Sequence, residues 1–380
     1  MTVDEDGNPI YVGFASDNYA PAHPQVMKFI EHYNRGFERP YNDDSVTEIV
    51  REKISALFGK DVAFFPVLNG TGSNVLSLRS ILPRYASVIA PETAHIVTDE
   101  SAAPEHMAGI KTMLSPSPDG KLTVDGILSH KTTIGNIHSP EPGAISISNT
   151  TELGTIYKPD EVAELAKTAH ELGLLVHLDG ARIFNALAAT NSTLKEMIAD
   201  TGVDIVSFGC TKLGAVSAES IVVLNENEVK NVKYSQKQMS QLSSKARYTS
   251  AQFLAMFAPY DAEAFTESLT AQIPSTPAGI MDSLAYLLAQ DSNDKAQYFY
   301  AKLKEVLATN PPNAIDIPPA ANALFPTLTK QMASRLRDNF HFYDWKSTAD
   351  MVQIRLMASF LTTTSDIDRF VQKLSVACKE

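Results

Sequence analysis

The stretch LVHLDGAR, residues 175–182, and the stretch VSFGCTK, residues 206–212, decide the fold of this chain. Each begins as an apolar run with strand character and ends abruptly in polar residues. This pattern is typical of a parallel β-strand that is buried on both faces and presents side chains at its C-terminal edge. Two neighbouring strand ends of this kind are expected to bring the carboxylate of Asp179 close to the amine of Lys212.

An acid and an amine at adjacent strand ends are the two groups that pyridoxal 5'-phosphate (PLP) chemistry needs. The amine binds the cofactor covalently, and the carboxylate keeps the pyridine nitrogen protonated so that the ring accepts electrons. Taken singly, Lys212 also fits a surface lysine at a strand end, and Asp179 also fits a helix N-cap. The shared strand-end context of the two residues favours the functional interpretation.

Strand and helix patterns alternate through most of the chain. A proline-initiated helix is predicted over residues 159–172, with Gly173 just after its end. The predicted strands are residues 62–68, 87–90, 110–114, 144–148, 174–178, 205–208 and 220–224. Alternation of this kind predicts βαβ units, and therefore a mostly parallel sheet with helices on both faces.

Two helices are predicted before the first strand. Apolar residues recur at helical spacing over residues 23–34. The second helix is opened by Ser45 with Glu48 three residues later, a capping-box pattern, and it ends at Gly59.

The domain organisation follows from length and from a change in character. A chain of 380 residues exceeds one ordinary core. The sequence becomes polar and rich in lysine and glutamine around Glu226, and Pro274 and Pro277 indicate a boundary region. We predict an N-terminal segment over residues 1–20, a large PLP-binding α/β domain over 21–258 and a small α+β domain over 259–380, on which the N-terminal segment is expected to pack.

Composition excludes several classes of protein. The net charge is −12 without a run of lysines or arginines, which disfavours nucleic acid and anionic membranes as partners. The two cysteines form neither a disulfide framework nor a metal-binding spacing, and they suit a reducing cytosol. The acidic start lacks a signal-peptide core, and no apolar stretch approaches the roughly eighteen residues of a membrane span. These features predict a soluble cytoplasmic protein without a required metal.

Three further features carry candidate chemistry. The glycine-containing turn 69–74 can bind a phosphate through its N–H groups and the hydroxyl of Thr71 or Ser73, although a plain tight turn explains it equally. His95 follows a buried strand and can stack on a cofactor ring or move protons, or be an ordinary loop histidine. Arg355 lies in an apolar run and suits a bidentate carboxylate; water or a protein carboxylate is the alternative partner.

Seven stretches of the chain carry a resemblance to a known family: residues 14–19, 35–44, 69–71, 92–95, 151–157, 177–185 and 207–212. Placed together, they resemble the threonine aldolase family of fold-type-I PLP enzymes, within the β-eliminating lyases, and most of all its low-specificity L-threonine aldolases. They follow the family's order along nearly the whole chain. Arg247 and Arg355 correspond to the later arginines of the family.

The resemblance implies a role for each matching residue. Lys212 would hold PLP covalently, Asp179 would pair with its ring nitrogen, and His95 would stack on the ring. The other implied cofactor residues are Gly70 and Thr71 at the phosphate, Arg182 near the ring hydroxyl, and Arg247, which reaches a phosphate from a neighbouring subunit. The implied substrate-carboxylate residues are Ser16, Arg182 and Arg355. Sites in this family form between subunits, which implies a homodimer or a homotetramer.

The implied reaction is the cleavage of L-threonine, L-allo-threonine and related β-hydroxy-α-amino acids to glycine and an aldehyde. The base for the β-hydroxyl does not carry over, because Thr151 and Glu152 stand where another branch of the family has a histidine. His95 or an ordered water is our interpretation. Another β-eliminating lyase, a phenylserine-type aldolase or an aminotransferase on the same scaffold is the alternative, and a non-catalytic protein that kept the fold is a further one.

Overall fold

The computed structural model describes residues 12–260 and 269–378. These residues form two compact units, divided between Pro21 and Ala22 and between Leu287 and Leu288. The larger unit lies between the two boundaries, and the smaller unit combines the segments outside them. The domains predicted from sequence end at residues 20 and 258, and that division stays a prediction. Within the described ranges, no helix has both the length and the apolar character needed to cross a membrane.

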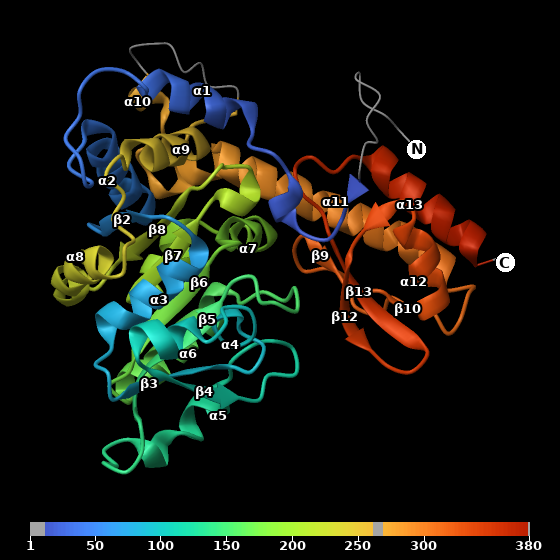
Figure 1. The fold of residues 1–380 in the computed structure, drawn as a ribbon, viewed down its shortest axis with the longest axis horizontal. Helices are drawn as coiled ribbons and strands as arrows, with labels where there is room; N and C mark the ends of the chain where they lie inside the picture. Colours follow the sequence, from blue (N-terminus) through green and yellow to red (C-terminus); the bar gives the residue numbers. More distant parts are fainter. Residues whose placement is uncertain (1–11, 261–268, 379–380) are drawn as a thin grey trace. The chain divides into compact units, whose positions relative to one another are not determined.

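A seven-stranded sheet forms the centre of the larger unit, in the order β2-β8-β7-β6-β5-β3-β4 (Figure 1). The strands from β7 to β4 are parallel to one another, whereas β8 is antiparallel to both β2 and β7. Their bounds are β2 (Ala63–Val67), β3 (Ala86–Pro91), β4 (Lys111–Ser115), β5 (Glu141–Ser148), β6 (Leu175–Gly180), β7 (Ile205–Gly209) and β8 (Glu219–Val223). The predicted α/β fold with a mostly parallel sheet is confirmed.

Helices cover both faces of this sheet. On one face, α3 (Gly70–Ile81) and α8 (Val229–Gln238) pack against strand residues such as Ile205 and Ile221. On the other face, Phe208 meets four rings at centroid distances of 5.7 to 6.2 Å. These rings belong to Phe58 of α2 (Ser45–Phe58), Phe184 of α7 (Ile183–Thr190), and Phe253 and Phe257 of α9 (Arg247–Phe257). The remaining helices of this unit are α1 (Pro24–Tyr33), α4 (His95–Thr98), α5 (Val124–Leu128), α6 (Pro159–Glu171) and α10 (Leu269–Gln272).

Two helices begin differently from the prediction. The N-cap of α2 is Asp44, whose carboxylate accepts the Thr47 N–H at 2.8 Å. The capping role expected of Ser45 was therefore wrong, and its hydroxyl instead donates to Glu38 at 2.7 Å. Helix α3 begins within the glycine turn rather than after it, because the Asn69 side chain caps the Gly72 N–H at 2.7 Å.

The smaller unit is an α+β structure. Its short first strand, β1 (Val12–Gly13), pairs in parallel with β11 (Phe340–His341). An antiparallel sheet is built on β13 (Met351–Met357), which pairs with β12 (Tyr343–Ser347), β10 (Thr327–Thr329) and β9 (Ala323–Leu324). The helices are most of α11 (Leu284–Leu307), α12 (Lys330–Arg337) and α13 (Thr364–Ala377). Buried rings of Phe14, Phe299, Phe340 and Phe370 form its core. The predicted smaller α+β architecture is confirmed.

Candidate active site

The polar ends of β6 and β7 lie side by side at one edge of the sheet. Asp179 is in register with Ser207, and Lys212 follows β7 in a short helical turn, η5 (Thr211–Leu213). Asp179 is 8% exposed. Burial by itself raises the pKa of Asp179, but the Lys212 cation, the Ala181 N–H and His95 together hold this pKa below its usual value. The structure thus brings the acid and the amine into electrostatic contact.

Asp179 is not a helix N-cap, which was the alternative left open by the sequence. Helix α7 is capped at Arg182, the third residue after Asp179. One carboxylate oxygen of Asp179 accepts the Ala181 N–H at 3.0 Å, and the other accepts Asn74 Nδ2 at 2.8 Å. The carboxylate is therefore fixed from both its own strand end and helix α3.

A chain of polar groups connects Asp179 with His95. Asn74 Nδ2 also contacts Glu100 Oε1 at 2.8 Å, and this oxygen lies 2.7 Å from His95 Nδ1. The Glu100 side chain is fully buried, whereas that of His95 is 36% exposed. The hydrogen bond to Glu100 is the main reason that the pKa of His95 is raised. A buried carboxylate thus orients the imidazole and favours its protonated form.

A second buried acid holds the backbone of His95. Glu152 Oε1 accepts the His95 N–H at 2.8 Å and the Ser148 hydroxyl at 3.1 Å. Burial, followed by the nearby charge of Asp179, raises the pKa of Glu152. His95 is therefore fixed through its ring by Glu100 and through its main chain by Glu152.

His177 lies on the same side of β6 as Asp179, two positions earlier. Its Nδ1 is 2.9 Å from the Ser146 hydroxyl on β5, and its Nε2 is 3.0 Å from the Ser207 hydroxyl on β7. Burial lowers the pKa of His177 to about 4. A neutral imidazole thus connects three parallel strands next to Asp179.

The predicted phosphate residues, Gly70 and Thr71, open helix α3. The Ser73 N–H makes the first helical hydrogen bond, to Asn69 O at 3.0 Å. The N–H groups of Gly70 and Thr71 precede that bond, at the end of the helix that favours anions. The turn is braced by Gln241, whose side-chain oxygen accepts the Leu68 N–H at 3.1 Å. Its geometry suits an anion such as a phosphate.

The structure places Arg247 beside the segment around residue 36. Arg247 is the first residue of α9 and donates to the carbonyl oxygens of Arg35 and Gly36, at 3.2 Å each. Its guanidinium also lies 5.2 Å from the centroid of the Tyr248 ring. Arg247 therefore supports the segment around residue 36, and a role at a phosphate stays a prediction.

The predicted carboxylate-binding residues Ser16 and Arg355 both belong to the smaller unit. The Arg355 guanidinium donates to Ala15 O at 3.0 Å, one residue before Ser16. It also lies 5.3 Å from the ring centroids of both Tyr343 and Trp345. The Ser16 hydroxyl accepts the Asn18 N–H at 3.2 Å. The smaller unit thus holds these two groups near one another by main-chain and aromatic contacts.

Sequence reasoning missed five polar residues at or beside the sheet edge: Asn74, Glu100, Glu152 as a partner of His95, His177, and Glu219, the buried first residue of β8. The two-residue spacing of a strand placed His177 on the face of Asp179, so this residue could have been found. No spacing connects Asn74 or Glu100 with Asp179, because tertiary packing alone brings them together.

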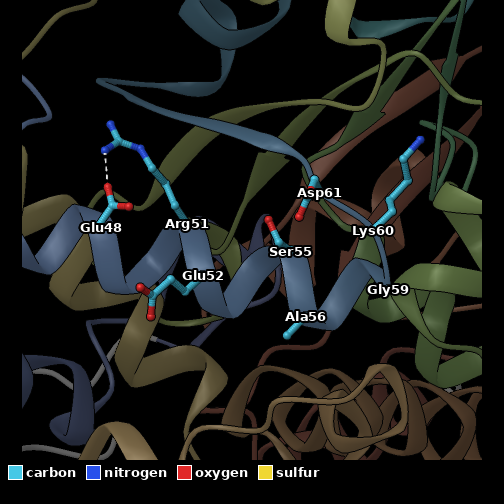
Figure 2. A pocket seen from close by; sticks show the side chains of 8 residues that line it. All are labelled: Glu48, Arg51, Glu52, Ser55, Ala56, Gly59, Lys60 and Asp61. Carbon is cyan, nitrogen blue, oxygen red and sulfur yellow. Dashed lines mark hydrogen bonds and ion pairs between the residues drawn. The ribbon is translucent and has the colours of Figure 1, made fainter.

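A separate pocket lies on α2 and the turn that follows it. Figure 2 shows that Glu48, Arg51 and Glu52 rise from α2, where Arg51 pairs with Glu48 at 2.8 Å, whereas Lys60 and Asp61 come from the turn that follows. The lining residues are Glu48, Arg51, Glu52, Ser55, Ala56, Gly59, Lys60 and Asp61. None of the site residues predicted from sequence lines it. The pocket therefore belongs to an exposed helix face and not to the strand ends of Asp179 and Lys212.

Comparisons with known proteins agree with this geometry. A profile of the β-eliminating lyase family matches residues 13–316. A low specificity L-threonine aldolase of Pseudomonas aeruginosa is 34% identical over 85% of this chain and 86% of its own, and one from another Pseudomonas strain is 39% identical over 64% and 70%. A solved threonine aldolase of Leishmania major has a TM-score of 0.82 at 28% identity, covering 97% of this chain and 99% of its own.

The fold and the lysine–aspartate edge define the class of the protein, which is that of the fold-type-I PLP enzymes. Within that class, the chain belongs to the β-eliminating lyase family. This membership implies dependence on PLP.

Proposed function

We propose that this protein is a PLP-dependent aldehyde-lyase, a low-specificity L-threonine aldolase. It cleaves L-threonine, L-allo-threonine and related β-hydroxy-α-amino acids to glycine and an aldehyde. The observation that carries the proposal is the buried carboxylate of Asp179 beside the Lys212 amine at adjacent strand ends, whose charges interact. The names of the related Pseudomonas and Leishmania proteins support the choice of substrate.

The residues at the sheet edge fit PLP. Lys212 would hold the cofactor, Asp179 its ring nitrogen, and the N–H groups of Gly70 and Thr71 its phosphate. When bound, PLP supplies an electron sink for negative charge at the substrate's Cα. Asn74 Oδ1 and Glu100 Oε2 are buried and have no hydrogen-bond partner among the described residues, as expected beside a polar ligand. Arg182, three residues after Asp179, is assigned to the ring hydroxyl and the substrate carboxylate.

Arg355 and Ser16 bind the substrate carboxylate in this proposal. A guanidinium offers a planar pair of donors that matches a carboxylate. The aromatic faces of Tyr343 and Trp345 flank the Arg355 guanidinium, and these contacts hold the cation in place. A fixed carboxylate determines which bond at Cα is cleaved, and this orientation is the main contribution of the chain to selectivity.

His95 takes the proton of the β-hydroxyl in this proposal. Its Nδ1 is held by Glu100, which assigns proton transfer to Nε2. The partly exposed ring keeps access to water, so the proton can leave the site. Glu152 keeps His95 in place through the backbone and has no part in the proton transfer itself.

We also propose that the protein acts in the cytoplasm as a homodimer or homotetramer with sites at the subunit interface. The fully exposed ring of Phe37, next to the segment held by Arg247, supports a contact surface there. In such an assembly, Arg247 of one subunit would reach the phosphate bound by another.

The proposed reaction is tested with the purified protein, PLP and L-threonine. Acetaldehyde and glycine must appear in equal amounts. Ammonia and a keto acid would instead indicate a β-eliminating lyase, and a protein that takes up no PLP would indicate a non-catalytic one. Borohydride reduction followed by peptide mapping should place the phosphopyridoxyl label on Lys212. The Lys212→Ala variant should fold and lose both the label and turnover.

A further inference from the structure

Glu219 lies between the two turns that the proposed function assigns to phosphate and lysine. It is the first residue of β8, which is antiparallel to its neighbours, so it lies at the edge where β2 and β7 end. Glu219 pairs with Val67 on one side and with Gly209 on the other. The phosphate turn begins two residues after Val67, and Lys212 lies three residues after Gly209.

The Glu219 side chain occupies the same face of the sheet as Asp179. Gly209 separates them, and a Cβ at this glycine would come within 2.7 Å of the carboxyl carbon and 2.8 Å of Oε1 of Glu219. The absence of a side chain at Gly209 therefore gives the carboxylate its place. Glu219 Oε2 also lies 3.9 Å from the Cβ position of Gly70, the first residue of α3. One carboxylate thus lies close to both the end of β7 and the first residue of α3.

Hydrogen bonds connect this carboxylate to the lysine turn. Glu219 accepts both the hydroxyl and the backbone N–H of Thr211, the residue before Lys212. The Thr211 hydroxyl in turn accepts the Ala218 N–H at 3.1 Å, and the Cys210 N–H donates to Ala218 O at 2.8 Å. Helix α3 is attached to the same strand, because the Ser73 hydroxyl donates to Ser220 O at 2.8 Å.

Glu219 is 8% exposed, so it is a buried acid. Burial raises the pKa of Glu219 and Asp179 adds to the rise, whereas the bonds from Thr211 and the Lys212 charge oppose it. A buried acid of this kind disfavours folding unless its hydrogen bonds are made. The folded state therefore requires the hydrogen bonds between Glu219 and Thr211, and these bonds fix the turn that presents Lys212.

We propose that Glu219 is a positioning residue that sets the Lys212 turn against the phosphate turn and so shapes the cofactor site. The proposal rests on the proposed use of PLP. Glu219 acts through its hydrogen bonds to Thr211, and Gly209 leaves space for the Glu219 side chain. Glutamine keeps an acceptor for Thr211, whereas alanine removes it.

The test measures PLP affinity by titrating the cofactor's visible absorbance into the apoprotein. Glu219→Ala is expected to weaken PLP binding about tenfold or more, as when a buried hydrogen-bonded partner is lost. Glu219→Gln should stay within about threefold of wild type, because it restores the acceptor. Thr211→Val removes the hydroxyl of this contact and keeps the backbone N–H, so it should weaken PLP binding in the same direction as Glu219→Ala, and it serves if that variant fails to fold.

Glu196→Ala is the matched control. Glu196 also accepts a threonine N–H and hydroxyl, both from Thr193 at 2.8 Å, but Glu196 is exposed and belongs to a different segment from Lys212. The Glu196→Ala variant should leave PLP affinity unchanged. Wild-type affinity in both Glu219→Ala and Thr211→Val would overturn the proposal. So would a fall in melting temperature that is equal with and without PLP. If wild type itself binds no PLP, the proposed function fails instead.

Discussion

The sheet edge of the larger unit and the arginine region of the smaller unit hold their charges in opposite ways. Asp179 and Glu100 are buried, and each is bound by oriented polar partners. Arg355 is half-buried, rests against two aromatic rings and donates a hydrogen bond to the main-chain oxygen of Ala15. A buried carboxylate requires a network of hydrogen-bonding partners, whereas a partly exposed guanidinium can also be held by aromatic faces.

This difference separates two kinds of function. Changes in the larger unit should alter the chemistry and the pKa values of the groups that perform it. Changes around Arg355 should alter substrate affinity and leave the chemical step intact. The following predictions test this separation, beginning with the largest effect.

Removal of the Asp179 carboxylate should have the largest effect. Asp179→Ala is expected to lower kcat by about 10²- to 10³-fold, the loss typical of one preorganised electrostatic group. Initial rates of acetaldehyde release at saturating PLP and L-threonine measure it. Asp200→Ala, an exposed carboxylate paired with Lys195, is the control and should retain activity. A folded Asp179→Ala enzyme with wild-type kcat would contradict the role of the sheet edge.

His177 should make stability depend on pH. Burial lowers its pKa to about 4 from an ordinary value of 6.5, so between these pH values the unfolded chain binds a proton that the folded chain does not. The free energy of unfolding should therefore fall as pH drops from 6.5 to 4, by about 3 kcal/mol from this residue. His177→Asn should remove that contribution.

Urea unfolding of the apoprotein at several pH values between 6.5 and 4 measures the effect. His138→Asn is the control, since His138 is exposed and should leave the pH dependence as in wild type. Parallel stability curves for wild type and His177→Asn would show that His177 does not remain neutral in the fold.

Much of this larger unit could be predicted from the sequence because its signals are local. The apolar runs before Asp179 and Lys212 determine both the strands and the edge at which the two residues meet. The antiparallel direction of β8 was not predictable, because an apolar strand has no directional signal. Without that direction, Glu219 could not be placed between the two turns.

The polar partners were harder to predict than the primary residues. Asn74, Glu100 and Asp179 come from three separate segments, and their contacts depend on how α3 packs on the sheet. Likewise, Asp44 caps α2 in place of Ser45, whose hydroxyl is bound by Glu38 from an earlier segment. Choices of this kind depend on three-dimensional geometry that a spacing rule does not contain.

Glu100 should control the pH dependence of activity through His95. Its hydrogen bond raises the pKa of His95, so Glu100→Gln should lower that pKa and move the acidic limb of the kcat profile to lower pH. We expect kcat at its optimum to fall about tenfold, as a poorly positioned base would give. The raised pKa of His95 stabilises the folded state below pH 6.5, and this stabilisation is lost as pH rises. Glu100→Gln should therefore lower the free energy of unfolding mainly at low pH.

Rates measured across the pH range decide this prediction. Glu105→Gln is the control, since Glu105 is an exposed carboxylate that accepts the Thr112 hydroxyl. An acidic limb that stays in place in Glu100→Gln would mean that His95 is not the group whose protonation limits the reaction.

Arg355→Lys should produce the smallest change and the clearest contrast with the sheet edge. Lysine keeps the charge but loses the planar pair of donors, so KM for L-threonine is expected to rise about tenfold while kcat changes little. Arg337→Lys is a matched control, because Arg337 also lies over an aromatic ring, 4.7 Å from the centroid of Phe342, in the same unit. It should leave KM unchanged.

Trp345 offers an independent measurement, since it is the sole tryptophan of the chain and lies 5.3 Å from the Arg355 guanidinium. Binding of glycine should change its fluorescence in a saturable manner, with a midpoint about tenfold higher in Arg355→Lys. If Arg355→Lys instead lowered kcat and left both KM and this midpoint unchanged, Arg355 would act in the chemical step. The division between a buried centre for chemistry and a half-buried cation for binding would then be wrong.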